Sequence, residues 1–150
     1  MISVEVTGDK ELIADLRGYE KQADKAIQKA VDDTARKIKE IAITRLKGGL
    51  GSAVHVIAGW LIGSIYDKPG EKLERMVGTG QEYAPYIEFG TGELVFQNFE
   101  FDADSRRAAA EYKGKKKVKG IRGDSFLNYG AVNQRKKFIE RITDNLNKIK

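Results

Sequence analysis

The chain has 150 residues, of which 41% are apolar and 33% charged, and its formal net charge is +5. This length and composition fit one globular domain with its own core, and they exclude fibrous and wholly disordered proteins. The absence of cysteine excludes disulfides, thiolate nucleophiles and cysteine-ligated metal sites, and a single histidine, His55, leaves little for a histidine base.

The first third of the chain predicts a short strand followed by a long amphipathic helix. Apolar and polar residues alternate over 2–6, and apolar residues then recur at steps of three and four from Leu12 to Leu46. Lys47 and the glycines after it end the pattern as a helix C-terminus does. A helix of about 38 residues would be about 57 Å long. We therefore expect it either to break near Gly18 or to extend and meet a partner.

The remaining elements are shorter. Residues 54–66 fit either a short helix or a buried strand, because their apolar run has no clean period. Residues 72–78 and 94–101 alternate as strands, and 133–150 carry the apolar stripe of a terminal helix. Together they predict one α+β domain over 1–150, in which a long N-terminal amphipathic helix packs on a small, mostly antiparallel sheet and a helix ends the chain.

Membrane insertion and secretion are not expected. The longest apolar stretch, residues 53–65, is interrupted by polar residues and glycines and is shorter than the about 20 residues of a membrane span. The first residues lack the basic and apolar regions of a secretion signal. We expect a soluble, intracellular protein at synthesis that does not bind a membrane.

The positive charge is concentrated in one segment. Residues 105–123 hold eight basic residues and one acid, which gives this window +7 and leaves −2 for the rest of the chain. We expect a long exposed basic loop at about 103–123. Such a loop could contact DNA without reading its sequence, or an acidic protein surface, and the alternative is a solvated loop that no partner touches. The candidate contact residues are Lys113, Lys115, Lys116, Lys117, Lys119 and Arg122.

Patterns that would indicate an enzyme are missing. His55 lies near Ser64 and Asp67 in sequence, but this proximity gives no triad geometry, and there is no G-x-S-x-G motif. The glycines match no phosphate-binding fingerprint. Acid pairs such as Glu82 and Glu88 arise by chance, and solvated faces explain them. We expect no catalytic residues, no cofactor and no metal site.

The segment YAPYIEFGTG, residues 83–92, is unusual because three aromatic residues, a proline and two glycines fall within ten positions. Local considerations predict a strand that starts after Ala84-Pro85 and ends in a glycine turn, where Gly90 or Gly92 takes a positive φ. We expect the long helix to pack on the sheet that carries Tyr86 and Phe89. The helix residues expected in this contact are Leu16, Ala23, Ile27, Ala30 and Ile38.

Taken whole, residues 83–92 resemble the signature of the phage tail-component family, the gene-ten-like neck proteins of lambdoid siphophages. The order of the other family elements agrees, with Leu61-Ile-Gly-Ser64-Ile65 before the motif and Ser125-Phe126-Leu127 before the terminal helix. Two departures are a missing proline before Phe126 and a longer link over 93–122.

The resemblance implies a structural virion protein of the neck or head–tail junction, present in the host cytoplasm during assembly. It would act in tail completion or joining as a homo-oligomeric ring, with other connector, neck or tail proteins as partners. In such a ring the basic loop could line the passage of the genome or bind an acidic neighbour, and the alternative is an outward solvated loop that no partner touches. The alternative is a small nucleic-acid-binding module that uses Lys113 to Arg122. The motif residues implied at the subunit interface are Tyr83, Ala84, Pro85, Tyr86, Glu88, Phe89, Gly90, Thr91 and Gly92.

Overall fold

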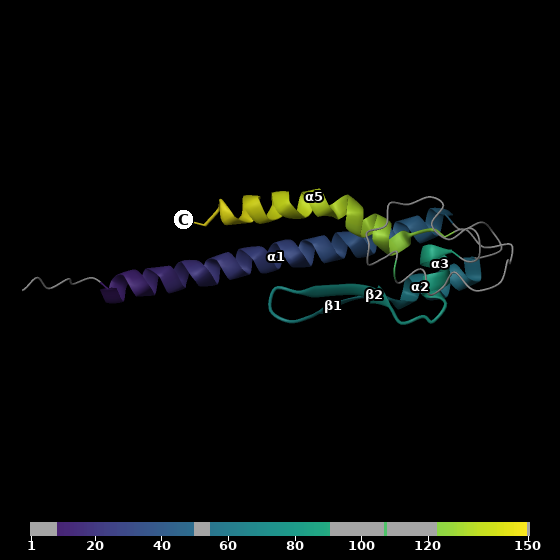
Figure 1. The fold of residues 1–150 in the computed structure, drawn as a ribbon, viewed down its shortest axis with the longest axis horizontal. Helices are drawn as coiled ribbons and strands as arrows, with labels where there is room; N and C mark the ends of the chain where they lie inside the picture. The colour runs from purple at the N-terminus through teal and green to yellow at the C-terminus, as the bar shows by residue number, and fades with distance from the viewer. Residues whose placement is uncertain (1–8, 50–54, 91–106, 108–122, 150) are drawn as a thin grey trace, which may run out of the picture.

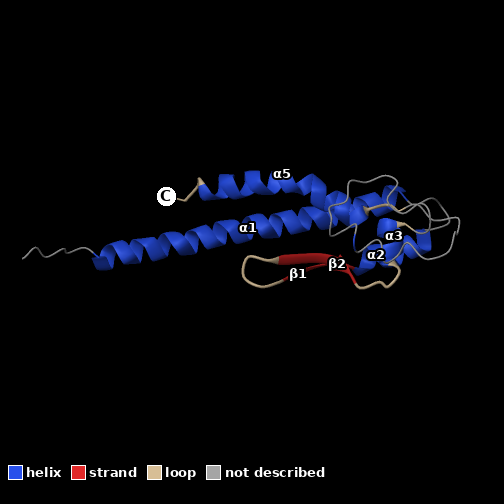
Figure 2. Ribbon diagram, viewed as in Figure 1, coloured by secondary structure: helices blue, strands red, loops and turns tan. Residues whose placement is uncertain are grey.

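The computed structural model describes residues 9–49, 55–90, 107 and 123–149. Its elements in chain order are α1 (Asp9–Gly49), α2 (His55–Ser64), β1 (Ile65–Pro69), β2 (Arg75–Thr79), α3 (Ala84–Phe89) and α5 (Phe126–Leu146). The fold is α+β and mostly helical, with a long N-terminal helix, a two-stranded antiparallel sheet and a C-terminal helix, as predicted (Figure 2). The strands predicted over 2–6 and 94–101 lie outside the described residues.

Helix α1 is the axis of the molecule, and α5 and the β1–β2 hairpin lie along opposite sides of it (Figure 1). It has 41 residues, so it is about 62 Å long at 1.5 Å per residue. Gly18 does not break it, which leaves the second of the two expected outcomes, an extended helix. Among the described residues, no helix is both long and apolar enough to cross a membrane.

Helix α5 runs antiparallel to α1 and begins at Phe126, earlier than the predicted start at 133. The sequence did not predict its first turns, residues 126–132, as helix because they contain Gly130, and glycine is a poor helix former. A Cβ at Gly130 would lie 3.0 Å from the carbonyl oxygen of Ile38 in α1. The glycine therefore lets the two helices approach closely at this crossing.

The hairpin is fixed to α1 by polar contacts. Strands β1 and β2 pair from Ile65 with Thr79 to Pro69 with Arg75. The guanidinium of Arg75 binds Asp67 across the hairpin through Nε and Asp32 of α1 through Nη1, at 3.1 Å. The strand predicted over 72–78 is thus confirmed with a shifted start. Of the two alternatives predicted for 54–66, the helix forms as α2, and β1 begins at Ile65.

The hydrophobic core lies where α1 ends and α2, β1, α3 and α5 meet. Its buried residues are Ala42, Leu46, Leu61, Ile65, Ala84 and Phe126.

The predicted stripe on α1 is correct only in part. Ala30 is buried and Ala23, Ile27 and Ile38 are half-buried, but Leu16 is 59% exposed. Tyr86 and Phe89 lie on the helix α3 and not on a sheet, so the expected surface for this stripe was wrong.

Candidate functional site

The described part of the motif, residues 83–90, forms the short helix α3 and not the predicted strand. Pro85 stands in the first turn, where its fixed φ suits a helix and its missing N–H costs nothing. Gly90 ends the helix at φ 82°, and its N–H donates to the carbonyl of Tyr86 at 3.0 Å. The positive φ expected at Gly90 is confirmed, whereas Thr91 and Gly92 lie outside the described residues.

Glu88 of the motif is buried and caps another helix. Only 6% of it is exposed, in contrast to the solvated acid that the sequence predicts. Its Oε2 accepts the N–H of Leu127 at 2.9 Å, and its Oε1 accepts the N–H of Asn128 at 2.8 Å. These N–H groups belong to the first turn of α5 and have no partner within that helix. A carboxylate also favours the positive end of the helix dipole, so Glu88 holds the start of α5.

The chain before α5 lies against the end of α3. The N–H of Asp124 donates to the carbonyl of Ile87 at 2.7 Å, and the N–H of Ser125 donates to that of Glu88 at 2.9 Å. A Cβ at Gly123 would lie 2.4 Å from the carbonyl carbon of Phe89 and 2.6 Å from the nitrogen of Gly90. Because backbone fills that space, only glycine fits at position 123. The described residues on either side of 91–122, Gly90 and Gly123, are therefore in direct contact.

Arg45, near the end of α1, completes the junction. Its Nε donates a hydrogen bond to the backbone oxygen of Asp124 at 2.6 Å, and the guanidinium forms an ion pair with the carboxylate of the same residue, with 3.0 Å between Nε and Oδ1. The guanidinium also stacks on the ring of Tyr129, 4.2 Å from the ring centroid. We call the group Arg45, Glu88, Gly123, Asp124 and Ser125 the α3–α5 junction.

The two acids of the junction, Glu88 and Asp124, are shielded from solvent. Burial raises the pKa of Glu88 above its ordinary value, and the two N–H donors of α5 oppose this. Burial likewise raises the pKa of Asp124, and Arg45 opposes it. Within the described residues, Oδ2 of Asp124 and Oγ of Ser125 are buried without a hydrogen-bond partner. Ser125 also has a left-handed backbone, with φ 52° and ψ 44°.

The sequence-predicted residues separate into two groups. Tyr83, Ala84, Pro85, Tyr86, Glu88, Phe89 and Gly90 lie together on α3 or beside it. The basic residues Lys113, Lys115, Lys116, Lys117, Lys119 and Arg122 lie outside the described residues, so their DNA or acidic-partner contact stays a prediction.

Sequence reasoning assigned no role in this junction to Arg45, Gly123 or Asp124, and it named Ser125 only as part of the element before the terminal helix. The signal that was present is Gly123-Asp-Ser125 before an apolar helix, which is typical of a helix start. The part of the chain that the structure describes has no group of three or more acids or histidines that could hold a metal. The arrangement binds the ends of α1, α3 and α5 to one another.

A match to a protein-family model covers more than half of the chain. The family model described as "Bacteriophage HK97-gp10, putative tail-component" matches residues 10–90, which include α1, α2, the hairpin and α3. No curated protein and no solved structure matches the chain.

Proposed function

Because the chain belongs to the HK97-gp10-like family of phage tail components, we propose that it is a structural protein of the neck or head–tail junction that forms a ring of identical subunits. The matched segment covers more than half of the chain and contains α1, the hairpin and the motif helix. The family supports a structural role in the virion, and the ring and the place at the junction are the parts that we add.

The observation that favours assembly is the uncovered end of α1. Leu12, Leu16 and Tyr19 are more than half exposed, although they continue the amphipathic pattern of the packed part of the helix. An apolar helix face that its own chain leaves exposed is typical of a protein that meets a partner. In a ring each subunit presents one surface to a different surface of its neighbour, so large exposed apolar faces are expected on each subunit.

Tail completion is the role within the neck that we propose. The α3–α5 junction supports it by fixing α3, α5 and the end of α1 as one rigid body through Glu88 and Arg45. A rigid subunit suits a structural ring. The partners would be other connector, neck or tail proteins, with the basic residues 113–122 as a possible contact to the genome.

The test uses the phage that encodes this chain. We place a nonsense mutation in its gene and grow the phage in a host that does not suppress it. Electron microscopy of the lysate is then expected to show full heads and tails that are not joined to each other. Mass spectrometry of purified wild-type virions should find the chain in several copies per particle. Normal infectious virions formed without the protein would overturn the proposal.

The alternative from the sequence, a small nucleic-acid-binding module, gives a different result in the same material. It predicts a chain that is missing from purified virions and that binds DNA with an affinity that falls steeply as salt is raised. A virion-borne chain with weak DNA affinity favours the structural role.

A further inference from the structure

The first turns of α1 carry an apolar stripe that extends beyond the elements packed on this helix. Lys72 of the hairpin binds Asp24 at 2.6 Å, and Asn145 near the end of α5 donates to the carbonyl of Ala26 at 3.1 Å. Residues 9–22, which we call the overhang, precede both contacts and project past α5 and the hairpin (Figure 1). At 1.5 Å per residue the overhang is about 21 Å long.

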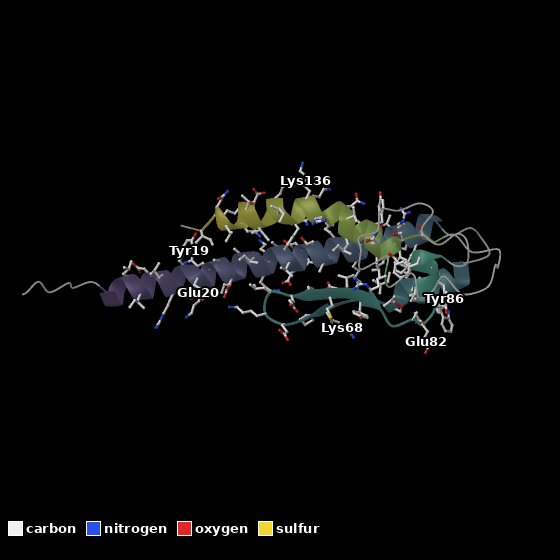
Figure 3. All side chains as sticks on the ribbon, viewed as in Figure 1. Tyr19, Glu20, Lys68, Glu82, Tyr86 and Lys136 are labelled. Atoms are coloured by element: carbon white, nitrogen blue, oxygen red, sulfur yellow. The ribbon has the colours of Figure 1, made fainter. Side chains whose placement is uncertain are left out.

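Three exposed apolar residues of the overhang lie on one face, and Ile13, which is 47% exposed, lies beside that face. Leu12, Leu16 and Tyr19 stand at positions i, i+4 and i+7, and they are 60%, 59% and 55% exposed. Figure 3 shows Tyr19 on the side of α1 along which α5 lies further on. The stripe therefore continues the α5-facing surface beyond the end of α5. This spacing is the one that a helix uses to anchor in an apolar groove.

The same chain has such a groove. It has a volume of about 680 Å³ and lies over α1, between α5 on one side and the β2 strand with its turn on the other. Its floor comes from Val31 and Ile38, one wall from Ala131 and Phe138, and its other wall includes Val77. Phe89 of the family motif also lines it. No described residue of the chain fills this apolar space.

A chain cannot place the overhang in its own groove. The overhang and the groove floor belong to one uninterrupted helix, so the overhang would have to fold back through 180°. We propose that the overhang of one copy docks in the groove of a second copy. This inference rests on the proposed ring, to which it adds a specific contact. The contact joins two different surfaces and so propagates from one subunit to the next.

Charges beside the two surfaces fit this docking. At about 100° per residue, exposed Asp15 borders the overhang stripe on one side, and exposed Arg17 lies further round the helix on the other side, about 130° from the centre of the stripe. Exposed Arg135 stands beside the α5 wall of the groove, and exposed Glu74 lines the opposite wall. A docked overhang with Asp15 at Arg135 and Arg17 at Glu74 of the second copy would pair each charge with its opposite.

The first experiment measures the mass of the purified full chain by light scattering over a concentration series. Leu16→Glu changes the stripe, and Ile139→Glu on the outer face of α5 is the matched control, because Ile139 is 61% exposed. We expect the wild type to associate, Leu16→Glu to weaken association by about tenfold or more, and Ile139→Glu to leave it unchanged. Circular dichroism should show equal helix content in all three proteins, since both side chains are exposed.

A charge exchange tests the orientation. Asp15→Arg and Arg135→Asp should each weaken association, and the two changes combined in one chain should restore it, because the pair then reappears with reversed signs. Restoration cannot come from a general effect on solubility or folding. Failure of the double variant to recover would overturn the assigned pairing and the docking pose that it defines.

Cross-linking gives a direct readout, because the chain has no cysteine of its own. Leu16→Cys mixed with Ala131→Cys should give a disulfide-linked dimer on mild oxidation, whereas Leu16→Cys mixed with Ile139→Cys should not. If Leu16→Glu still forms oligomers and no cross-link forms between positions 16 and 131, the proposed docking is wrong, but the proposed ring is not contradicted. A monomeric wild type without this cross-link also overturns the docking, while the virion experiment judges the proposed function separately.

Discussion

The two ends of α1 carry the same sequence pattern and have opposite environments. Towards its C-terminus, Ala42 and Leu46 are completely or almost completely buried against α2, β1 and α5. Towards its N-terminus, Leu12 and Leu16 occupy the same kind of position in the pattern and are about 60% exposed. The helical periodicity of the sequence thus identifies which face of α1 is apolar, whereas the lengths of α5 and the hairpin determine how much of that face is buried.

This contrast also separates stability from assembly. At the packed end each apolar side chain removes surface from water within the chain, so its loss should lower the free energy of unfolding. At the overhang the same side chains contribute little to the fold of one subunit. The docking proposed above would account for the apolar side chains at these positions.

The largest expected effect is at the packed end. Phe126→Ala removes the largest fully buried side chain among the described residues and should lower the free energy of unfolding by about 3–5 kcal/mol. Leu16→Ala, the matched change at the overhang, should alter it by less than about 0.5 kcal/mol. Urea denaturation of the monomer, followed by circular dichroism, measures both. Equal losses would mean that the overhang is part of the core.

Two glycines sharpen the same comparison. Gly123→Ala would place a Cβ within 2.7 Å of three backbone atoms, so the junction must shift, at a cost of about 2–3 kcal/mol. Gly18→Ala, in the overhang helix, meets nothing within 4 Å and should stabilise by about 1 kcal/mol, because alanine is the better helix former. Thermal melting should therefore move in opposite directions. A lower melting temperature for Gly18→Ala would contradict the open surroundings of the overhang.

Glu88 gives the third prediction. Glu88→Ala removes the acceptor of two N–H groups at the start of α5 and should cost about 2 kcal/mol. Glu88→Gln keeps one acceptor and should lose less. Denaturant titrations at neutral pH compare the two, and equal stability of Glu88→Ala and the wild type would show that the cap is not needed.

The raised pKa of Glu88 adds a pH dependence with a defined sign. The folded chain binds this proton more tightly than the unfolded chain, whose glutamate has the ordinary value of 4.5. The free energy of unfolding of the wild type relative to that of Glu88→Gln should thus be greatest at a pH below the ordinary pKa of glutamate. It should fall as the pH rises through the raised pKa of Glu88 and stay constant at higher pH. The neighbouring Asp124, whose pKa is also raised, and Arg45 are present in both proteins, so much of their effect cancels in the difference. A relative stability that rises with pH would contradict the assignment.

The sequence predicts the elements that have a regular pattern. The 3.6-residue period over Leu12 to Leu46 predicts α1, and alternation beside a Pro-Gly turn predicts the hairpin strand. The family motif gives the correct family but the wrong local structure. Its aromatic residues favour a strand, whereas Pro85 in the first turn and Gly90 at the end are signals of the helix that forms.

The junction could not be predicted, because its partners are distant in sequence. Glu88 looks like any surface acid until the start of α5, 39 residues later, is placed beside it. Arg45 likewise continues the polar face of a helix, and its contact with Asp124 spans 79 residues. Local patterns do not contain this information, since burial of a charge depends on which tertiary contacts supply its hydrogen bonds.

The last expected effect is a stabilisation at the junction. Ser125 is fully buried, its φ is 52°, and its Oγ has no hydrogen-bond partner among the described residues. Ser125→Gly removes the unpaired hydroxyl, and it relieves the strain that a residue with a Cβ has in a left-handed backbone conformation. Glycine also raises the conformational entropy of the unfolded chain, which lowers the stability. The balance should be about 1 kcal/mol in favour of the variant. Ser125→Ala, which removes only the hydroxyl and keeps the strained φ, should gain less, so denaturant unfolding of the two variants separates the contributions. A loss of stability in Ser125→Gly would mean that the hydroxyl makes a contact within the junction that outweighs the backbone strain.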